Sequence, residues 1–220
     1  MSRLDYKLLI FDWDGTLANS IGRIVESMHT ASTRSGFEPC SDLEVKGIIG
    51  LGLPEAIRTL YPQIDDSQLI AFRQHYADHY IALEAEPSPL FDGVRQSLEA
   101  FRAQGYYLAV ATGKARRGLD RVLKAHGWDD YFDITRAADE TASKPHPLML
   151  EQILAHCGVA PRKALMVGDA SFDLMMARNA GMDSVAVSYG AQAAEALQQY
   201  EPRLTIDHFS ELQAWLGRAQ

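Results

Sequence analysis

The chain has 220 residues, of which 47% are hydrophobic and 23% are charged. This length suffices for one α/β core with a smaller accessory unit, and the composition excludes a largely disordered chain. The formal net charge of −8, from 21 basic and 29 acidic residues, leaves no cationic surplus, so we expect neither nucleic acid nor an anionic membrane as a partner.

Short apolar runs recur along the chain, and each is followed by small or acidic residues and then by an amphipathic stretch. The runs predict buried parallel strands at 7–11, 107–111, 131–134, 164–167, 184–187 and 204–206. The stretches predict helices at 93–104, 115–126, 147–157 and 172–180, with stops at Gly105, Gly127, Gly158 and Gly181. Repeated strand-helix units imply a Rossmann-like α/β fold, in which helices cover both faces of a parallel sheet.

Residues 21–89 break this alternation, because they carry several helical patterns and no strand pattern. Helices are expected at 21–35, 42–49, 54–61 and 67–84. The segment ends in residues 86–89, Glu-Pro-Ser-Pro, a composition suited to a hinge. We therefore predict an α-helical cap domain at 21–89, inserted into an α/β core domain formed by 1–20 and 90–220.

The start of the chain and the cysteines both bear on location. The first apolar run soon meets Asp12 and Asp14, which suits neither a secretory signal nor a membrane span. Cys40 and Cys157 lie far apart and belong to no CxxC pair, so neither a disulfide framework nor a zinc site is expected. Both observations favour a cytoplasmic protein.

Two aspartates follow the first predicted strand, where Asp12 and Asp14 flank Trp13. Alternate side chains of an extended segment face the same way, so these carboxylates should point together beyond the strand end. One carboxylate can attack phosphorus, while a second can protonate the leaving alkoxide and later deprotonate water. We assign Asp12 as the nucleophile and Asp14 as the general acid and base; solvated aspartates that cap a helix are the structural alternative.

Two later segments supply candidates for holding a phosphoryl group. Thr112 and Gly113 follow the second strand, where a hydroxyl and backbone N–H groups at a helix N-terminus suit phosphate oxygens, although Thr-Gly is also a common N-cap and turn. Lys144 lies in a turn rigidified by proline and could neutralise both the attacking carboxylate and the phosphoryl group, unless it is an ordinary surface lysine. His146 is interpreted as structural.

Asp169 and Asp173 follow the fourth predicted strand. Mg²⁺ prefers oxygen ligands and commonly uses a few carboxylates together with substrate phosphate. Asp169 is expected to bind Mg²⁺ directly, in a set with Asp12 and Asp14. Asp173 lies four residues on and could hold a metal-bound water or orient Lys144; the alternative for both aspartates is an acidic helix start favoured by the helix dipole.

These four sites, in this order and at these strand ends, resemble the phosphatases of the haloacid dehalogenase-like (HAD) superfamily. Residues 12–16 read DWDGT, similar to the family's DxDGT motif, and the helical insertion resembles the cap of the phosphoglycolate phosphatase and β-phosphoglucomutase branch. The resemblance implies a Mg²⁺-dependent phosphatase that hydrolyses a small phosphorylated metabolite, a phosphoglycolate-like monoester, through an aspartyl phosphate. It also implies that the core performs the chemistry while residues 21–89 select the substrate.

Two positions bear on how far the resemblance extends. Asn19 stands where family members often carry an aspartate, and it can hydrogen-bond but has no charge. Residues 50–53, Gly-Leu-Gly-Leu, resemble a loop that dips toward the active site in relatives, and a helix turn with packing leucines explains them equally well. The sequence names neither the physiological ester nor the oligomeric state, for which a monomer and a homodimer both stay open.

The same residues bear on alternative activities within the superfamily and on two roles outside enzymes. Asp14 disfavours a haloacid dehalogenase, which typically lacks it, and a phosphonate hydrolase, which has alanine there and uses a cap lysine, here only Lys46. A phosphoglucomutase-like enzyme stays possible because it shares the nucleophile, the acid and base, and the cap. Outside enzymes, the alternatives are a receiver-like switch that is phosphorylated on aspartate and a non-catalytic binding protein.

Overall fold

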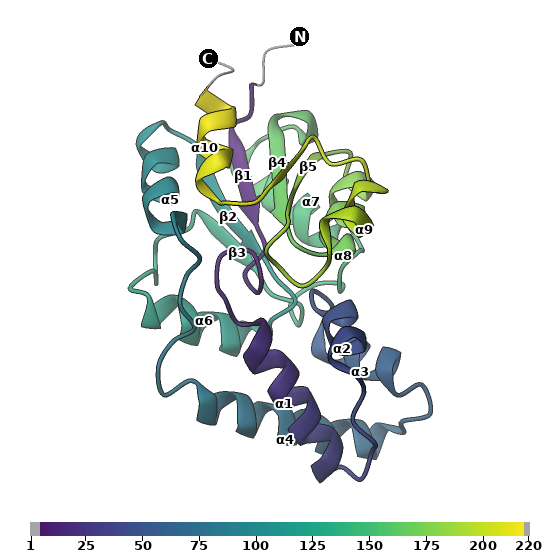
Figure 1. Cartoon of the computed structure of the whole chain (residues 1–220). Coiled ribbons are helices and arrows are strands. Elements are labelled where there is room, and N and C mark those ends of the chain that lie inside the picture. Colours follow the sequence, from purple (N-terminus) through teal and green to yellow (C-terminus); the bar gives the residue numbers. More distant parts are fainter. Residues whose placement is uncertain (1–4, 218–220) are drawn as a thin grey trace.

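The computed structural model describes residues 5–217 of the chain. Its centre is a six-stranded sheet with the order β3-β2-β1-β4-β5-β6, and every neighbouring pair is parallel. The strands are β1 (Leu8–Phe11), β2 (Tyr107–Ala111), β3 (Ile134–Arg136), β4 (Ala164–Gly168), β5 (Asp183–Val187) and β6 (Leu204–Ile206). The predicted Rossmann-like α/β fold is confirmed (Figure 1).

The central strand is apolar throughout because helices cover both faces of the sheet. Leu9 and Phe11 belong to one hydrophobic cluster, which they share with α5 (Val94–Ala103), α6 (Arg116–Ala125) and α10 (Ser210–Gly217). Leu8 and Ile10 point to the other face and pack with α7 (Leu148–Cys157) and α8 (Ser171–Asn179). Burial of both faces therefore explains why the strand contains no polar residue.

Most predicted core elements agree with the structure within one residue at each end, and one strand does not. The prediction of a strand at 131–134 is wrong, because Tyr131 and Phe132 pack their rings on Trp128, at centroid distances of 5.3 and 5.8 Å, instead of entering the sheet. The strand begins only at Ile134. The short helix α9 (Ala194–Gln198) and the helix α10 were not predicted.

Residues 21–89, all of which the structure describes, contain four helices and no strand. These are α1 (Ile21–Arg34), α2 (Asp42–Ile48), α3 (Leu53–Leu60) and α4 (Asp66–Leu83), which lie below the sheet in Figure 1. They pack around a hydrophobic cluster of their own, in which α1 lies against α4. We call residues 21–89 the helical insertion. None of the helices within residues 5–217 is long and apolar enough to cross a membrane.

Candidate active site

The site begins where three neighbouring strands end. Phe11 of β1 is in register with Val110 of β2 and with Val167 of β4, so the residues that follow these strands meet at one edge of the sheet. Asp12, Thr112 and Asp169 occupy this edge, and all three are buried, exposing at most 1% of their surface. Burial of two carboxylates beside one another requires compensating positive charge or strong hydrogen bonds.

Lys144 supplies part of that compensation. Its Nζ donates to Asp12 Oδ1 at 2.7 Å and to Asp173 Oδ1 at 2.7 Å, and its side chain is fully buried. Burial alone would lower the pKa of Lys144, but the charges of Asp12 and Asp173 outweigh it and raise that pKa above its ordinary value. The lysine is therefore a buried cation, not a surface residue. Asp173 contacts it directly, and the predicted role of this aspartate in orienting the lysine stays a prediction.

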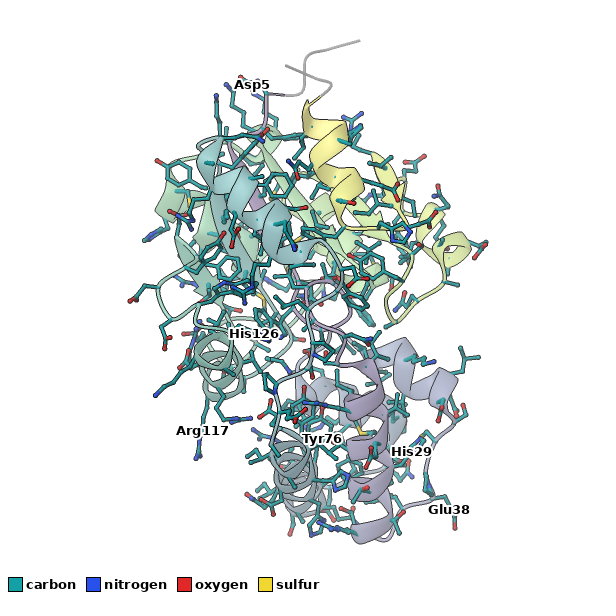
Figure 2. The ribbon with its side chains drawn as sticks, turned by 60° about the vertical axis from the view of Figure 1, so that its left-hand side comes forward. Asp5, His29, Glu38, Tyr76, Arg117 and His126 are labelled. Atoms are coloured by element: carbon teal, nitrogen blue, oxygen red, sulfur yellow. The ribbon has the colours of Figure 1, made fainter. Side chains whose placement is uncertain are left out.

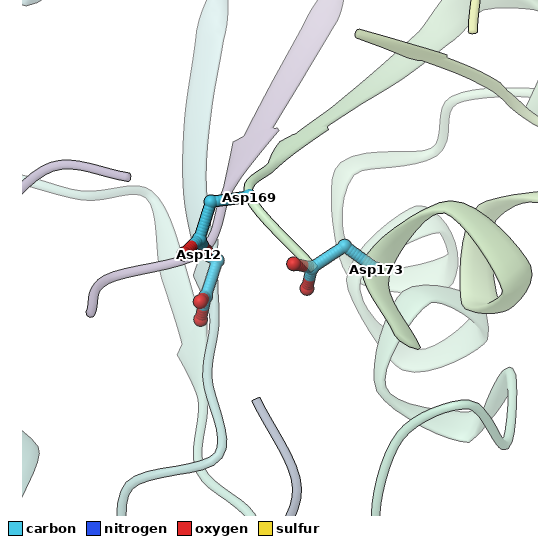
Figure 3. Close-up of side chains that lie close together, drawn as sticks. All are labelled: Asp12, Asp169 and Asp173. Atoms are coloured by element: carbon cyan, nitrogen blue, oxygen red, sulfur yellow. The ribbon is translucent and has the colours of Figure 1, made fainter. Parts of the chain in front are cut away.

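Three carboxylates form a compact acidic group. One oxygen each from Asp12, Asp169 and Asp173 lie within 4.8 Å of one another, with Asp12 and Asp169 adjacent and Asp173 directed toward them (Figure 3). Burial raises the pKa of Asp12 to about 7, against the attraction of Lys144. Burial, followed by the neighbouring charges of Asp12 and Asp173, raises the pKa of Asp169 well above its usual range. The group therefore has a deficit of positive charge.

A small divalent cation fits this deficit. Asp12 Oδ2 is buried and has no hydrogen-bond partner among the residues that the structure describes, which leaves an oxygen free to ligate a metal. Carboxylate oxygens are the ligands that Mg²⁺ takes in proteins. The sequence placed Asp14 in the ligand set with Asp12 and Asp169, whereas in the acidic group the third carboxylate belongs to Asp173.

The carboxylate of Asp169 is held in one orientation. Its Oδ1 accepts from Thr16 Oγ1 at 3.1 Å, and its Oδ2 accepts from the backbone N–H of Ala191 at 2.6 Å. A Cβ on Gly15 or on Gly190 would collide with this carboxylate, and Gly15 also has φ of 77°. Glycine at these positions therefore lets the backbone approach Asp169 closely. The contact of Thr16 was not predicted, although the residue belongs to the DWDGT motif.

Asp14 faces a different set of partners. Its Oδ1 accepts from Ser20 Oγ at 2.6 Å and lies 3.0 Å from Lys114 Nζ. Asp12 and Asp14 line the same cavity, as the alternation of an extended segment predicts. Asp14 thus lies at the cavity with its carboxylate paired to Lys114. Its predicted contribution to metal binding stays a prediction.

Lys114 links the core to the helical insertion and was missed by the sequence analysis. Its Nζ donates to Tyr80 Oη of α4 at 3.1 Å and lies 4.6 Å from the centre of the Tyr80 ring. Burial would lower the pKa of Lys114, but the charge of Asp14 raises it. The position of Lys114 directly after Thr112 and Gly113 was the available signal; its partners lie far away in sequence.

The predicted phosphate-binding residues lie against a loop of the insertion. Thr112 Oγ1 accepts from the backbone N–H of Lys114 at 3.1 Å. A Cβ on Gly113 would collide with the carbonyl oxygens of Gly50 and Leu51, so this loop passes directly over Gly113. Residues 50–53 thus lie at the site.

Two remaining sequence positions have only local contacts. His146 Nδ1 accepts from the backbone N–H of Leu148 at 3.2 Å, which suits its interpretation as structural. Asn19 is exposed, and its backbone N–H donates to the carbonyl oxygen of Pro89 at 2.8 Å, at the end of the insertion. His146 is not a member of the acidic group.

A cavity of about 260 Å³ opens from these residues into the space between the core and the insertion. The core contributes Asp12, Asp14, Gly113 and Lys114, together with the first turns of α6. Helices α1 to α4 and the loop at 49–51 contribute the opposite wall. The arrangement thus combines a buried carboxylate, a second carboxylate, the turn at Thr112 and Gly113 and a partly open cavity.

Comparison with known proteins gives consistent matches along the chain. The family model described as haloacid dehalogenase-like hydrolase matches residues 9–187. The phosphoglycolate phosphatase of Vibrio vulnificus (strain YJ016) is 30% identical, over 96% of each chain. The protein named "Probable phosphatase IndB" of Dickeya dadantii is 36% identical, over 93% of this chain and 91% of its own.

Two further comparisons point the same way. The pyrophosphatase PpaX of Bacillus cereus (strain AH820) is 31% identical, over 93% of each chain. A solved structure described as a haloacid dehalogenase-like hydrolase, from Bacteroides fragilis, has a TM-score of 0.87 and 29% identity, covering 94% of this chain and 99% of its own. The similarity extends through both the core and the insertion.

Proposed function

The chain belongs to the haloacid dehalogenase-like hydrolase family, and on that premise we propose that this phosphatase is Mg²⁺-dependent and forms an aspartyl phosphate on Asp12. Its substrate is a small phosphorylated metabolite, a phosphate monoester. One observation carries the proposal: Lys144 is fully buried between Asp12 and Asp173, beside an acidic group whose Asp12 Oδ2 has no hydrogen-bond partner within the described residues.

Asp12 is proposed as the nucleophile. Its carboxylate oxygen attacks phosphorus, the bond between phosphorus and the ester oxygen breaks, and the leaving alkoxide takes a proton from Asp14. Water then attacks the phosphoryl group on Asp12 while Asp14 accepts its proton, which releases phosphate and restores the free carboxylate. Both carboxylates line the cavity that would hold the ester, so no rearrangement of the strand ends is needed.

Charge on the phosphoryl group is stabilised from several sides. Lys144 contacts Asp12 directly and can follow the negative charge as it moves from the carboxylate to the phosphoryl oxygens. Thr112 and Gly113 offer a hydroxyl and backbone N–H groups at the end of β2. Asp12 and Asp169 would hold Mg²⁺, with Asp173 beside them; the bound ion supplies positive charge that offsets the phosphoryl oxygens.

The test is phosphate release from phosphoglycolate, pyrophosphate, ethyl phosphate and p-nitrophenyl phosphate, each with Mg²⁺ and with EDTA. Wild type is expected to release phosphate only with Mg²⁺, and Asp12→Asn should lose at least about 10⁴-fold in kcat. The control is Asp130→Asn, an exposed aspartate outside the site, which should behave as wild type. Release that survives in Asp12→Asn would remove the covalent mechanism, and conversion of an ester without net release would indicate a mutase.

A further inference from the structure

The cavity has one charged wall and one apolar wall. Among the lining residues that the structure describes, those from the helical insertion include no charged side chain. Side chains of its four helices and the loop at 49–51 form this wall, among them Ile24, Met28, Leu51, Leu53, Tyr76 and Ala77. Tyr76 faces the interior of the insertion in Figure 2, and its ring is stacked on that of Tyr80 at 5.8 Å. An anionic group placed against this wall would find no counter-charge there.

The cations on the core side of the cavity are already engaged or lie in solvent. Lys114 is paired with Asp14. Arg121 Nε donates to Glu84 at 2.8 Å. Arg117 is exposed, and Figure 2 shows it at the outer edge of the molecule, where solvent screens its charge. A carboxylate in the leaving group would therefore gain little from these side chains.

The volume sets the size of the group that the apolar wall can receive. An apolar protein cavity of about 150 Å³ holds a benzene molecule. The cavity of about 260 Å³ therefore has room for a ring of that size beyond the phosphoryl group that lies against Asp12. Its volume and lining match a hydrocarbon body better than the single carboxymethyl group of phosphoglycolate.

We infer that the preferred substrates of this phosphatase are phosphate monoesters of an apolar primary alcohol, whose hydrocarbon part fills the cavity against α1 and α4. This inference rests on the proposed function and adds the chemical class of the leaving group. The core recognises the phosphoryl group, while selectivity arises from the apolar surface that the leaving group removes from water.

The first experiment compares kcat/KM for benzyl phosphate, ethyl phosphate and phosphoglycolate with Mg²⁺. All three release an oxygen bound to a CH₂ group, so differences in leaving-group chemistry are small. Burial of a phenyl-sized group is expected to raise kcat/KM for benzyl phosphate about 10- to 150-fold above ethyl phosphate. Phosphoglycolate should be no better than ethyl phosphate, because its carboxylate loses solvent without gaining a partner.

The second experiment fills the cavity. Ala77 of α4 lines it, and Ala77→Leu should lower kcat/KM for benzyl phosphate about tenfold or more while leaving ethyl phosphate within about threefold. The matched control is Ala71→Leu, on the exposed face of the same helix, which should change kcat/KM for neither ester.

A third variant, Ile81→Ser, removes apolar surface from the cavity wall instead of filling the cavity. Because Ile81 is 45% exposed, this variant should fold, and it should lower benzyl phosphate turnover threefold or more without affecting ethyl phosphate.

The outcomes separate this inference from the proposed function. Efficient release from phosphoglycolate or pyrophosphate, at rates equal to or above those for benzyl phosphate, would leave the phosphatase standing and overturn the apolar substrate class. Equal losses for benzyl and ethyl phosphate in Ala77→Leu and Ile81→Ser would also overturn it. Absence of release from every ester would remove the proposed function and the inference with it.

Discussion

The charged centre at the strand ends and the apolar wall of the helical insertion are built in different ways. In the centre, Asp12, Lys144 and Asp169 are buried and each is fixed by at least one strong polar contact. Among the described residues, the insertion contributes two polar side-chain contacts to charged residues that line the cavity: Tyr80 Oη accepts from Lys114, and Glu84 accepts from Arg121. The rest of its wall is mainly apolar. The difference teaches that variants of Asp12, Lys144 or Asp169 should affect every alkyl ester alike, whereas variants of the wall should change the ranking of alkyl esters.

The largest combined effect on activity and stability is expected from Lys144→Ala. This variant should lose about 10³-fold or more in kcat/KM toward ethyl and benzyl phosphate equally, because the phosphoryl charge loses its buried cation. It should also lower the free energy of unfolding by about 3–5 kcal/mol in EDTA, since Asp12 and Asp173 stay buried without compensation. Initial rates and urea unfolding measure the two effects.

The control for Lys144→Ala is Lys163→Ala. The ammonium of Lys163 pairs with Asp5 at 2.9 Å but is 42% exposed, so its loss should cost less than about 1 kcal/mol and no activity. Equal stability of the two variants, or a loss of activity confined to one ester, would contradict the assignment of Lys144 to the centre.

The next effect is a split between leaving groups in Asp14→Asn. Removal of the proposed acid should lower kcat/KM for ethyl phosphate about 10²- to 10⁴-fold. The value for p-nitrophenyl phosphate should fall less than about tenfold, because p-nitrophenolate leaves without a proton. The parameter kcat/KM reports only the steps up to cleavage of the ester, so the later role of Asp14 does not confuse the result. Parallel losses for the two esters would contradict the role.

Metal binding provides a measurement that does not depend on turnover. At a Mg²⁺ concentration of about a hundred times its Kd, wild type should gain about 2.7 kcal/mol in stability, which appears as a higher Tm. Asp169→Asn keeps an oxygen that can accept from Ala191 or Thr16, yet it should lose most of the Mg²⁺ shift. Asp130→Asn should keep the full shift. An undiminished shift in Asp169→Asn would place the ion elsewhere.

The smallest effect is expected where the two regions touch. Tyr80→Phe keeps the ring over Lys114 but removes the hydroxyl that accepts its hydrogen bond. A lost hydrogen bond of about 0.5–1.5 kcal/mol corresponds to a two- to tenfold decrease in kcat/KM. Because Lys114 pairs with Asp14, the decrease should be the same for all esters, unlike that of Ala77→Leu on the same helix. A changed ranking of esters in Tyr80→Phe would contradict the claim that Tyr80 acts through Lys114 and not through the apolar wall.

The sequence predicted the sheet well because its strands are short apolar runs buried on both faces. It failed where an apolar run has another use: Tyr131 and Phe132 have the composition of a strand, but their rings pack around Trp128. The helix Ala194–Gln198 was missed because five residues give too short a pattern for helical periodicity.

The candidate site was predictable where it depends on the strand ends, and not where it depends on contacts between distant segments. Residues directly after parallel strands must converge, so Asp12, Thr112 and Asp169 followed from the strand predictions. The position of Asp173 in the acidic group with Asp12 and Asp169 depended on side-chain directions that spacing does not give. Contacts between distant segments, such as that of Lys114 with Tyr80, leave no local signal in the chain.

The most direct test of the covalent intermediate uses Asp14→Asn with p-nitrophenyl phosphate, because this pair allows phosphorylation but slows hydrolysis of the aspartyl phosphate. Rapid mixing should give a burst of p-nitrophenolate that approaches one equivalent per enzyme. Mass analysis of the acid-quenched protein should then locate a phosphoryl group on Asp12. A linear time course without a burst, together with no phosphoryl group on Asp12, would contradict the account.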